Sequence, residues 1–161
     1  MLTSFKNLPD ASRVWIYQAN RKLSDVEVAA ICPKIETFLN EWTAHGAHLE
    51  AGFEIKYNRF IVIGLNQENT SASGCSIDAS VRFVQSLEKQ FGIDLLDKMN
   101  VTYYNGKYIA HKPLSDFMAM AKNRSVSKNT VVFNNLANTK KEYLENWEVP
   151  AKDSWHSRFL A

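Results

Sequence analysis

Large apolar residues follow two different periods in the first half of the chain. They recur every three or four positions over 28–42 and again over 77–91, which predicts two amphipathic helices. Three shorter stretches are instead rich in β-branched and aromatic residues, a composition typical of strands. These predicted strands are Arg13–Ala19, Leu49–Tyr57 and Phe60–Asn66, the last two joined by a short turn at Asn58.

The ends of the two predicted helices carry signals of their own. Ser24-Asp25-Val26-Glu27 has the form of a capping box, so we expect the first helix to begin there. We expect it to end near His45-Gly46, with Gly46 as the left-handed stop, and the second helix to stop at Gly92. Pro33 lies inside the first helix, which therefore either kinks there or restarts with Pro33 in its first turn.

The second half of the chain predicts smaller elements. Asn105-Gly106 is the strongest kind of short hairpin signal, and it lies between two stretches rich in Val, Tyr and Ile. The tail 148–161 has no period, yet it is dense in large side chains, which predicts an ordered strap. Between the hairpin and the tail we expect a helix opened by Pro113-Leu114-Ser115, a strand over 129–133 and a helix over 140–147.

This order of elements indicates an α+β fold with a mostly antiparallel sheet. It reads β-α-β-β-α, followed by a smaller β-β-α-β-α half and an ordered C-terminal strap. With 161 residues, of which 45% are hydrophobic, the chain is long enough for one packed domain, and its composition argues against disorder. We therefore expect a single domain over 1–161, with sub-units of about 10–98 and 99–161.

Charge and cysteine content limit the partners and the cell compartment that we expect for the protein. The net charge is only +2, and basic residues are interspersed with acidic ones, so we expect neither nucleic acid nor a membrane as a partner. Residues 1–10 lack the basic and apolar regions of a signal peptide. Cys32 and Cys75 lie far apart in the sequence, and reduced thiols in the cytoplasm are the expectation.

The junction Ser73-Gly74-Cys75-Ser76-Ile77-Asp78 is the main candidate for chemistry. It places a thiol at a helix N-terminus, where free backbone N–H groups favour a thiolate or a small anionic ligand. In the functional interpretation Cys75 is the nucleophile, Asp78 or His156 is the base or orienting group, and Ser73, Gly74 and Ser76 bind the anion. In the structural interpretation these residues only cap the helix.

The C-terminal tail allows two compatible interpretations. In one, Trp155 and Phe159 pack onto the sheet and the tail is a strap. In the other, this packing brings His156 and Arg158 over the start of the Cys75 helix, where His156 serves as a base and Arg158 holds an anion.

Two further clusters point to metal or nucleic acid, and the sequence favours neither function. His45 and His48 are three positions apart, but Gly46 between them predicts turn histidines in solvent rather than converging ligands. A single hairpin turn carries the basic and aromatic residues Lys56, Tyr57, Arg59 and Phe60, as in single-strand binders, but the low net charge gives little support. We therefore expect no metal and no tightly bound cofactor.

Local resemblances extend this interpretation. The hairpin followed by Gly74-Cys75-Ser76-Ile77 resembles the U-type iron–sulfur cluster scaffolds, in which the corresponding Cys is a cluster or zinc ligand. Their other ligand cysteines have no counterpart here, and one thiol cannot hold a cluster. The stretch 103–133, with Tyr103-Tyr104, Leu114-Ser115 and Thr130-Val131-Val132-Phe133, resembles GYF-type adaptor modules, which bind peptides through an aromatic patch.

Over nearly its whole length the chain resembles a family of short bacterial proteins that often carry the name ABC transporter ATPase. The resemblance rests on Arg13–Tyr17, Ser73–Asp78, Val132–Leu136 and Trp147–Phe159, and it implies a shared fold without an activity. The name itself does not fit, because such an ATPase needs a Gly-rich loop ending in Gly-Lys-Ser/Thr. The one Gly-Lys pair, Gly106-Lys107, is followed by Tyr108 inside a hairpin, so we expect no ATP hydrolysis.

Two functions from different classes remain. The first is a cytoplasmic binding or adaptor protein for a protein or peptide partner, using aromatic residues of the second half and the tail. The second is a thiol-dependent enzyme or thiol-redox protein centred on Cys75.

Overall fold

A three-stranded antiparallel sheet forms the centre of the first half. The computed structural model describes residues 1–160, and its first sheet has the order β1-β5-β4, with β1 at Arg13–Gln18, β4 at Glu50–Lys56 and β5 at Phe60–Asn66. Six of the seven β5 residues are buried, as its unbroken apolar run predicts for a strand covered on both faces. The strand β1 is paired with β5 along one edge only.

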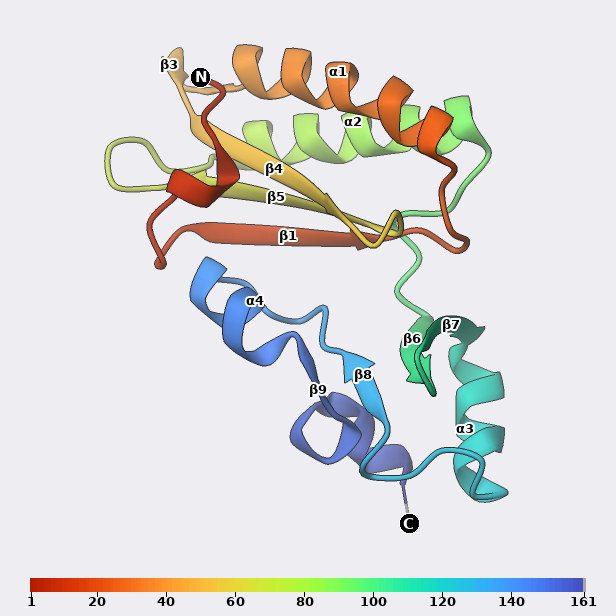
Figure 1. Ribbon diagram of the computed structural model, residues 1–161. Helices are drawn as coiled ribbons and strands as arrows, with labels where there is room; N and C mark the ends of the chain where they lie inside the picture. Colours follow the sequence, from red (N-terminus) through yellow and green to blue (C-terminus); the bar gives the residue numbers. More distant parts are fainter. Residues whose placement is uncertain (161) are drawn as a thin grey trace.

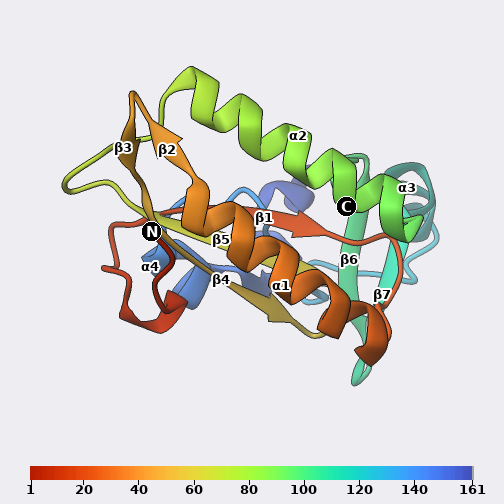
Figure 2. The same ribbon diagram turned by 90° about the horizontal axis from the view of Figure 1, so that it is seen from above.

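Two long helices cover one face of this sheet. They are α1 (Asp25–Glu41) and α2 (Gly74–Phe91), which lie side by side over the strands in Figure 1 and Figure 2. Their apolar stripes and the strands form one cluster that includes Ile35, Leu39 and Leu87. The expected α+β architecture with antiparallel strands is confirmed.

The start of α1 agrees with the prediction from the sequence, but its end does not. Ser24 and Glu27 form the predicted capping box, and α1 runs through Pro33 as one helix. The predicted stop at Gly46 is wrong, because α1 ends at Glu41 and a small hairpin follows, with β2 at Thr43–Ala44 and β3 at Ala47–His48. The left-handed backbone of His45 and Gly46, with φ of 52° and 80°, turns this hairpin rather than ending the helix.

The second half adds a four-stranded antiparallel sheet of order β7-β6-β8-β9. Its strands are β6 (Asn100–Asn105), β7 (Tyr108–Pro113), β8 (Val131–Phe133) and β9 (Glu148–Pro150), and its helices are α3 (Leu114–Lys122) and α4 (Lys140–Asn146). The hairpin at Asn105-Gly106 is confirmed. The strand β9 was not predicted, because three residues ending in Pro carry no period of their own.

Aromatic side chains from the second half cover the other face of the first sheet. Phe60 of β5 packs against Phe133 and Trp147, with ring centroids 4.8 and 4.7 Å apart, and Trp147 also contacts Tyr143 of α4. The two halves therefore share a buried cluster across the sheet, with α1 and α2 on one side and α4, β8 and β9 on the other (Figure 1).

The tail is ordered as two short 3-10 helices. These span Ala151–Asp153 and Trp155–Phe159, and the buried side chains of Ala151 and His156 fix them to the second half. Within residues 1–160, none of the helices combines the length and the apolar character that a membrane-spanning segment requires.

Candidate functional site

The start of α2 has the geometry of a capping box. The Ser73 hydroxyl accepts the N–H of Ser76 at 3.1 Å, and the Ser76 hydroxyl accepts the N–H of Ser73 at 2.7 Å. The N–H groups of Gly74 and Cys75 make no hydrogen bond with any residue of 1–160. Because Ser73 and Ser76 bond each other, the residues expected to bind an anion act here as the cap.

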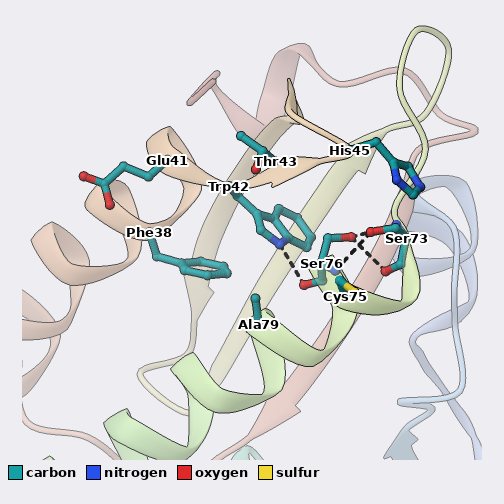
Figure 3. Close-up of a pocket in the computed structure, with 9 residues that line it drawn as sticks. All are labelled: Phe38, Glu41, Trp42, Thr43, His45, Ser73, Cys75, Ser76 and Ala79. Carbon is teal, nitrogen blue, oxygen red and sulfur yellow. Dashed lines mark hydrogen bonds between the residues drawn. The ribbon is translucent and has the colours of Figure 1, made fainter.

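Cys75 is exposed and lines a cavity of about 560 Å³ between α1 and α2 (Figure 3). The indole N–H of Trp42 donates to the carbonyl of Ser76 at 2.8 Å and so ties the start of α2 to the end of α1. Figure 3 shows His45, at the turn of the β2–β3 hairpin, on the same side of the cavity as Ser73 and Cys75. His45 is thus the imidazole that lines this cavity together with the thiol, whereas the sequence was interpreted as placing His45 in a solvent-exposed turn.

The side chains proposed to assist Cys75 lie elsewhere or make no contact with it. Asp78 is exposed, lies beyond the first turn of α2, and makes no side-chain hydrogen bond within 1–160. His156 is 1% exposed, its Nδ1 lies 2.7 Å from the Ser154 hydroxyl, and its ring stacks on Trp155 at 3.9 Å. Burial lowers the pKa of His156 to about 4, so its imidazole is neutral near pH 7.

The remaining tail residues form a strap. The Arg158 guanidinium lies 5.8 Å from the Trp155 ring and 4.9 Å from the Phe159 ring, and neither Arg158 nor Trp155 lines the Cys75 cavity. Trp155 packs instead against the core of the second half. His45 and His48 are exposed at the β2–β3 turn, and residues 1–160 contain no cluster of three or more groups suited to a metal ion.

A second cavity runs along the free edge of β1. Its volume is about 430 Å³ and all six residues of β1 line it. One wall comes from α2, through Ile77, Ser80 and Val81, and the other comes from the second half. The residues of that second wall are Asn100, Phe133, Asn135, Leu136, Ala137, Asn138, Trp155 and His156, and the connection after α2 adds Leu95, Leu96, Asp97 and Lys98. We call this cavity the β1 groove.

The backbone of β1 offers unpaired groups to the β1 groove. The N–H of Val14 points away from β5, because it donates to the carbonyl of Asn138 at 3.0 Å. Backbone groups alternate sides along an antiparallel strand, so the N–H and C=O of Ile16 point the same way. These groups of Ile16, and the C=O of Val14, have no hydrogen-bond partner among residues 1–160.

A buried polar network fixes the far end of the β1 groove. The Gln18 side-chain oxygen accepts the hydroxyl of Thr102 and the amide of Asn135, both at 2.8 Å. The side-chain oxygen of Asn135 in turn accepts the indole N–H of Trp147 at 2.8 Å. This network joins β1, β6 and the loop after β8, and so holds the wall from the second half in a fixed position relative to β1.

In comparisons with protein-family models, with curated proteins and with solved structures, no match to this chain was found. The geometry of its own residues is therefore the basis for any statement on function.

The β1 groove was not foreseen from the sequence. The pattern of apolar residues identifies β1 as a strand but does not say which strands flank it, and the edge position of β1 follows only from the pairing of β5 with both β1 and β4. One available signal was the pair Asn134-Asn135 directly after a predicted strand, since side-chain amides there can face a strand edge.

Proposed function

We propose that this protein is a cytoplasmic peptide-binding protein that takes up an extended segment of a partner along the free edge of β1. The observation that carries the proposal is the row of unpaired backbone groups at Val14 and Ile16, which faces a cavity rather than bulk solvent. An extended segment added to such an edge gains main-chain hydrogen bonds whatever its sequence. Cys32 and Cys75 are both free, in keeping with a reducing compartment.

The end of the groove near Arg13 gives the register of the added strand. There the chain after β8 already pairs with β1, because Val14 donates to Asn138 and the N–H of Lys140 donates to Ser12 at 2.8 Å. The partner segment would continue from Asn138 toward Gln18. Over this stretch β1 pairs with β5 on one edge and has no strand on its other edge. This short internal pairing supports the proposal that a partner strand adds to the β1 edge.

The walls of the groove would select side chains of the segment. In an extended peptide successive side chains point to opposite sides, so one set would face Ile77 and Val81 of α2 and the next would face Phe133 and Trp155. These walls are mostly apolar, while Asn100, Asn135, Asn138 and His156 supply polar groups and Asp97 and Lys98 supply one charge of each sign. A segment with apolar side chains at alternate positions therefore fits best.

A selection from a displayed library of short random peptides, followed by affinity measurements with the full chain, tests this proposal. The decisive variant is Ile16→Pro, because proline removes the outward N–H at an edge position where it is tolerated. Ile16→Val is the matched control, since it keeps the N–H. We expect Ile16→Pro to weaken the selected peptides at least about tenfold, the loss of one or two hydrogen bonds, and Ile16→Val to change little.

Two results would overturn the proposal. The first is a selection that enriches no peptide, and the second is a set of peptides that bind the wild-type and Ile16→Pro proteins equally well. Circular dichroism of the Ile16→Pro protein shows whether it is folded. If it is not, protection of the Ile16 amide from hydrogen exchange by the selected peptide decides the question in the wild-type chain.

The thiol-dependent alternative is favoured by one observation. Cys75 is exposed at a helix start and shares a cavity with the imidazole of His45. In this second proposal His45, rather than His156, would take the thiol proton. A rate of Cys75 alkylation that falls on His45→Ala would favour this alternative. A rate that stays unchanged would leave the start of α2 with the capping role of Ser73 and Ser76 alone.

A further inference from the structure

A cleft of about 430 Å³ separates the β4–β5 turn from the β6–β7 hairpin. It is lined by Lys22, Tyr57, Asn58, Arg59, Lys107, Tyr108 and Ile109, and shares no residue with the β1 groove or the Cys75 cavity. Three of these side chains are cationic, and none is a carboxylate. We call it the cationic cleft.

Arg59 is a half-buried arginine whose guanidinium has neither an ion-pair partner nor a hydrogen-bond acceptor among residues 1–160. Its Nη1 atom is fully buried. Burial lowers the pKa of Arg59, and no acidic group opposes that shift. A buried charged donor without an acceptor is costly, and each such group calls for an explanation such as a bound ion or ligand.

The turn that carries Arg59 is fixed in its conformation. Tyr57 and Asn58 both have left-handed backbone, with φ of 55° and 51°, and the carbonyl of Arg59 accepts the N–H of Ala19 at 2.7 Å. The Asn58 amide donates to Asp25 at 2.9 Å and ties the turn to the start of α1. The position of Arg59 is therefore built into the fold before any ligand arrives.

Two carboxylates near the cleft are already engaged. Asp25 accepts the amide of Asn58, and Glu148 accepts the hydroxyls of Tyr57 and Tyr104 at 2.9 and 2.6 Å. They therefore serve as acceptors for neutral donors and leave the guanidinium of Arg59 unpaired. Lys22, Arg59 and Lys107 therefore form no salt bridge with any residue of 1–160.

We propose that the cationic cleft binds the phosphate groups of a small phosphorylated molecule. The guanidinium offers a planar fork of donors suited to phosphate, and the two lysines add point charges at the rim. Three cations favour a group of several negative charges over a single carboxylate. The cleft has the size of a small-molecule site, and the exposed ring of Tyr108 beside Lys107 provides a face against which a planar group can stack.

A small molecule fits this cleft better than a nucleic acid strand. Lys56, which the sequence grouped with Tyr57 and Arg59 as a strand-binding cluster, does not line the cleft, and its ammonium lies 5.5 Å from the Tyr57 ring. The Tyr57 hydroxyl is held by Glu148, so its ring is not free to stack on a base. The cationic side chains thus gather at one point rather than along a track.

Calorimetric titration of the full chain with sodium pyrophosphate, at constant ionic strength, tests the proposal. We expect saturable binding that Arg59→Gln weakens at least about tenfold, because a charge-assisted hydrogen bond to phosphate is lost. Lys107→Gln should weaken it less. Arg82→Gln is the matched control, since it removes the same charge from an exposed position on α2, and it should have no effect.

Thermal unfolding supplies a second readout. Without pyrophosphate, Arg59→Gln should leave Tm unchanged or raise it, because the unpaired buried charge is gone. With pyrophosphate, Tm should rise for the wild-type protein and not for the variant.

Three results would overturn the proposal. The first is no saturable binding of pyrophosphate, and the second is a loss of binding in Arg82→Gln as large as that in Arg59→Gln. The third is binding of a single-stranded oligonucleotide that depends on Arg59, without binding of pyrophosphate. Ile16→Pro should leave pyrophosphate binding unchanged, so a failure of the β1 groove and a failure of the cationic cleft are told apart.

Discussion

The two faces of the β1-β5-β4 sheet are covered in different ways. On one face, α1 and α2 present apolar stripes such as Ile31, Ile35 and Leu39, and the cluster they form with the sheet is dominated by aliphatic side chains. On the other face, short strands and irregular segments present aromatic rings such as Phe133 and Trp147, together with the side-chain amides of Gln18 and Asn135. The comparison teaches that periodic helices cover a sheet with aliphatic side chains, whereas irregular cover brings aromatic rings and side-chain amides beside the strand edge.

The largest expected effect comes from removing one ring of the aromatic face. Phe133→Ala should lower the free energy of unfolding by about 3–5 kcal/mol, because Phe133 is 2% exposed and contacts Phe60 and Trp147. Leu39→Ala on the helical face should cost a similar amount, about 2–5 kcal/mol. Denaturant unfolding followed by circular dichroism gives both values.

The same measurement decides whether the two faces belong to one cooperative unit. We expect both variants to shift a single transition, and Leu144→Ala, at an exposed position of α4, to change the free energy of unfolding by less than about 0.5 kcal/mol. Two separate transitions in Phe133→Ala, the second retaining the helical signal of α1 and α2, would contradict a shared core.

An intermediate effect is expected from pH, through the buried His156 of the second half. Because burial holds the pKa of His156 at about 4, against about 6.5 in the unfolded chain, the unfolded state binds more protons between these values. Stability is therefore full above about pH 6.5 and falls by up to about 3 kcal/mol toward pH 4. Denaturant unfolding at a series of pH values measures this loss.

His156→Gln is the control for the pH dependence, since it removes the titrating group. In this variant the dependence of the free energy of unfolding on pH should flatten between about pH 6.5 and 4. A smaller slope should remain because burial also lowers the pKa of His111. An unchanged slope would mean that other groups dominate the acid response of the second half.

The smallest effect is expected on the helical face, at its exposed end. Cys75→Ser should change the free energy of unfolding by less than about 0.5 kcal/mol, because Cys75 is exposed and the cap is made by Ser73 and Ser76. Ellman's reagent should react with Cys75 before Cys32, because burial and the nearby Glu36 raise the pKa of the Cys32 thiol. Faster reaction of Cys32, measured in the two single-cysteine variants, would contradict this order.

Sequence patterns predict what depends on neighbours along the chain. The capping box at Ser24 and the Asn105-Gly106 turn each rest on hydrogen bonds over a few residues, and both are confirmed. The predicted end of α1 was wrong because of the same property that made Gly46 a candidate helix stop, its left-handed backbone. A left-handed glycine ends a helix or turns a hairpin equally well, and only the pairing of β2 with β3 distinguishes the two.

Features that depend on contacts between distant residues were not predictable in this way. The partners of Gln18 lie at Thr102 and Asn135, more than 80 positions away, and no local pattern links them. The tail was expected to be ordered, but whether His156 would face Cys75 or pack against Phe117 depends on how the second half folds. The β1 groove and the cationic cleft both lie between segments that only the tertiary fold brings together.

Hydrogen exchange at the backbone amide of Ile16 tests the open β1 edge most directly. In the free protein we predict that this amide exchanges much faster than those of Trp15 and Tyr17, which point toward β5, and that a peptide selected on the wild-type chain slows it to their level. An Ile16 amide that is already protected in the free protein, or that stays unprotected with the peptide bound, would contradict strand addition at β1.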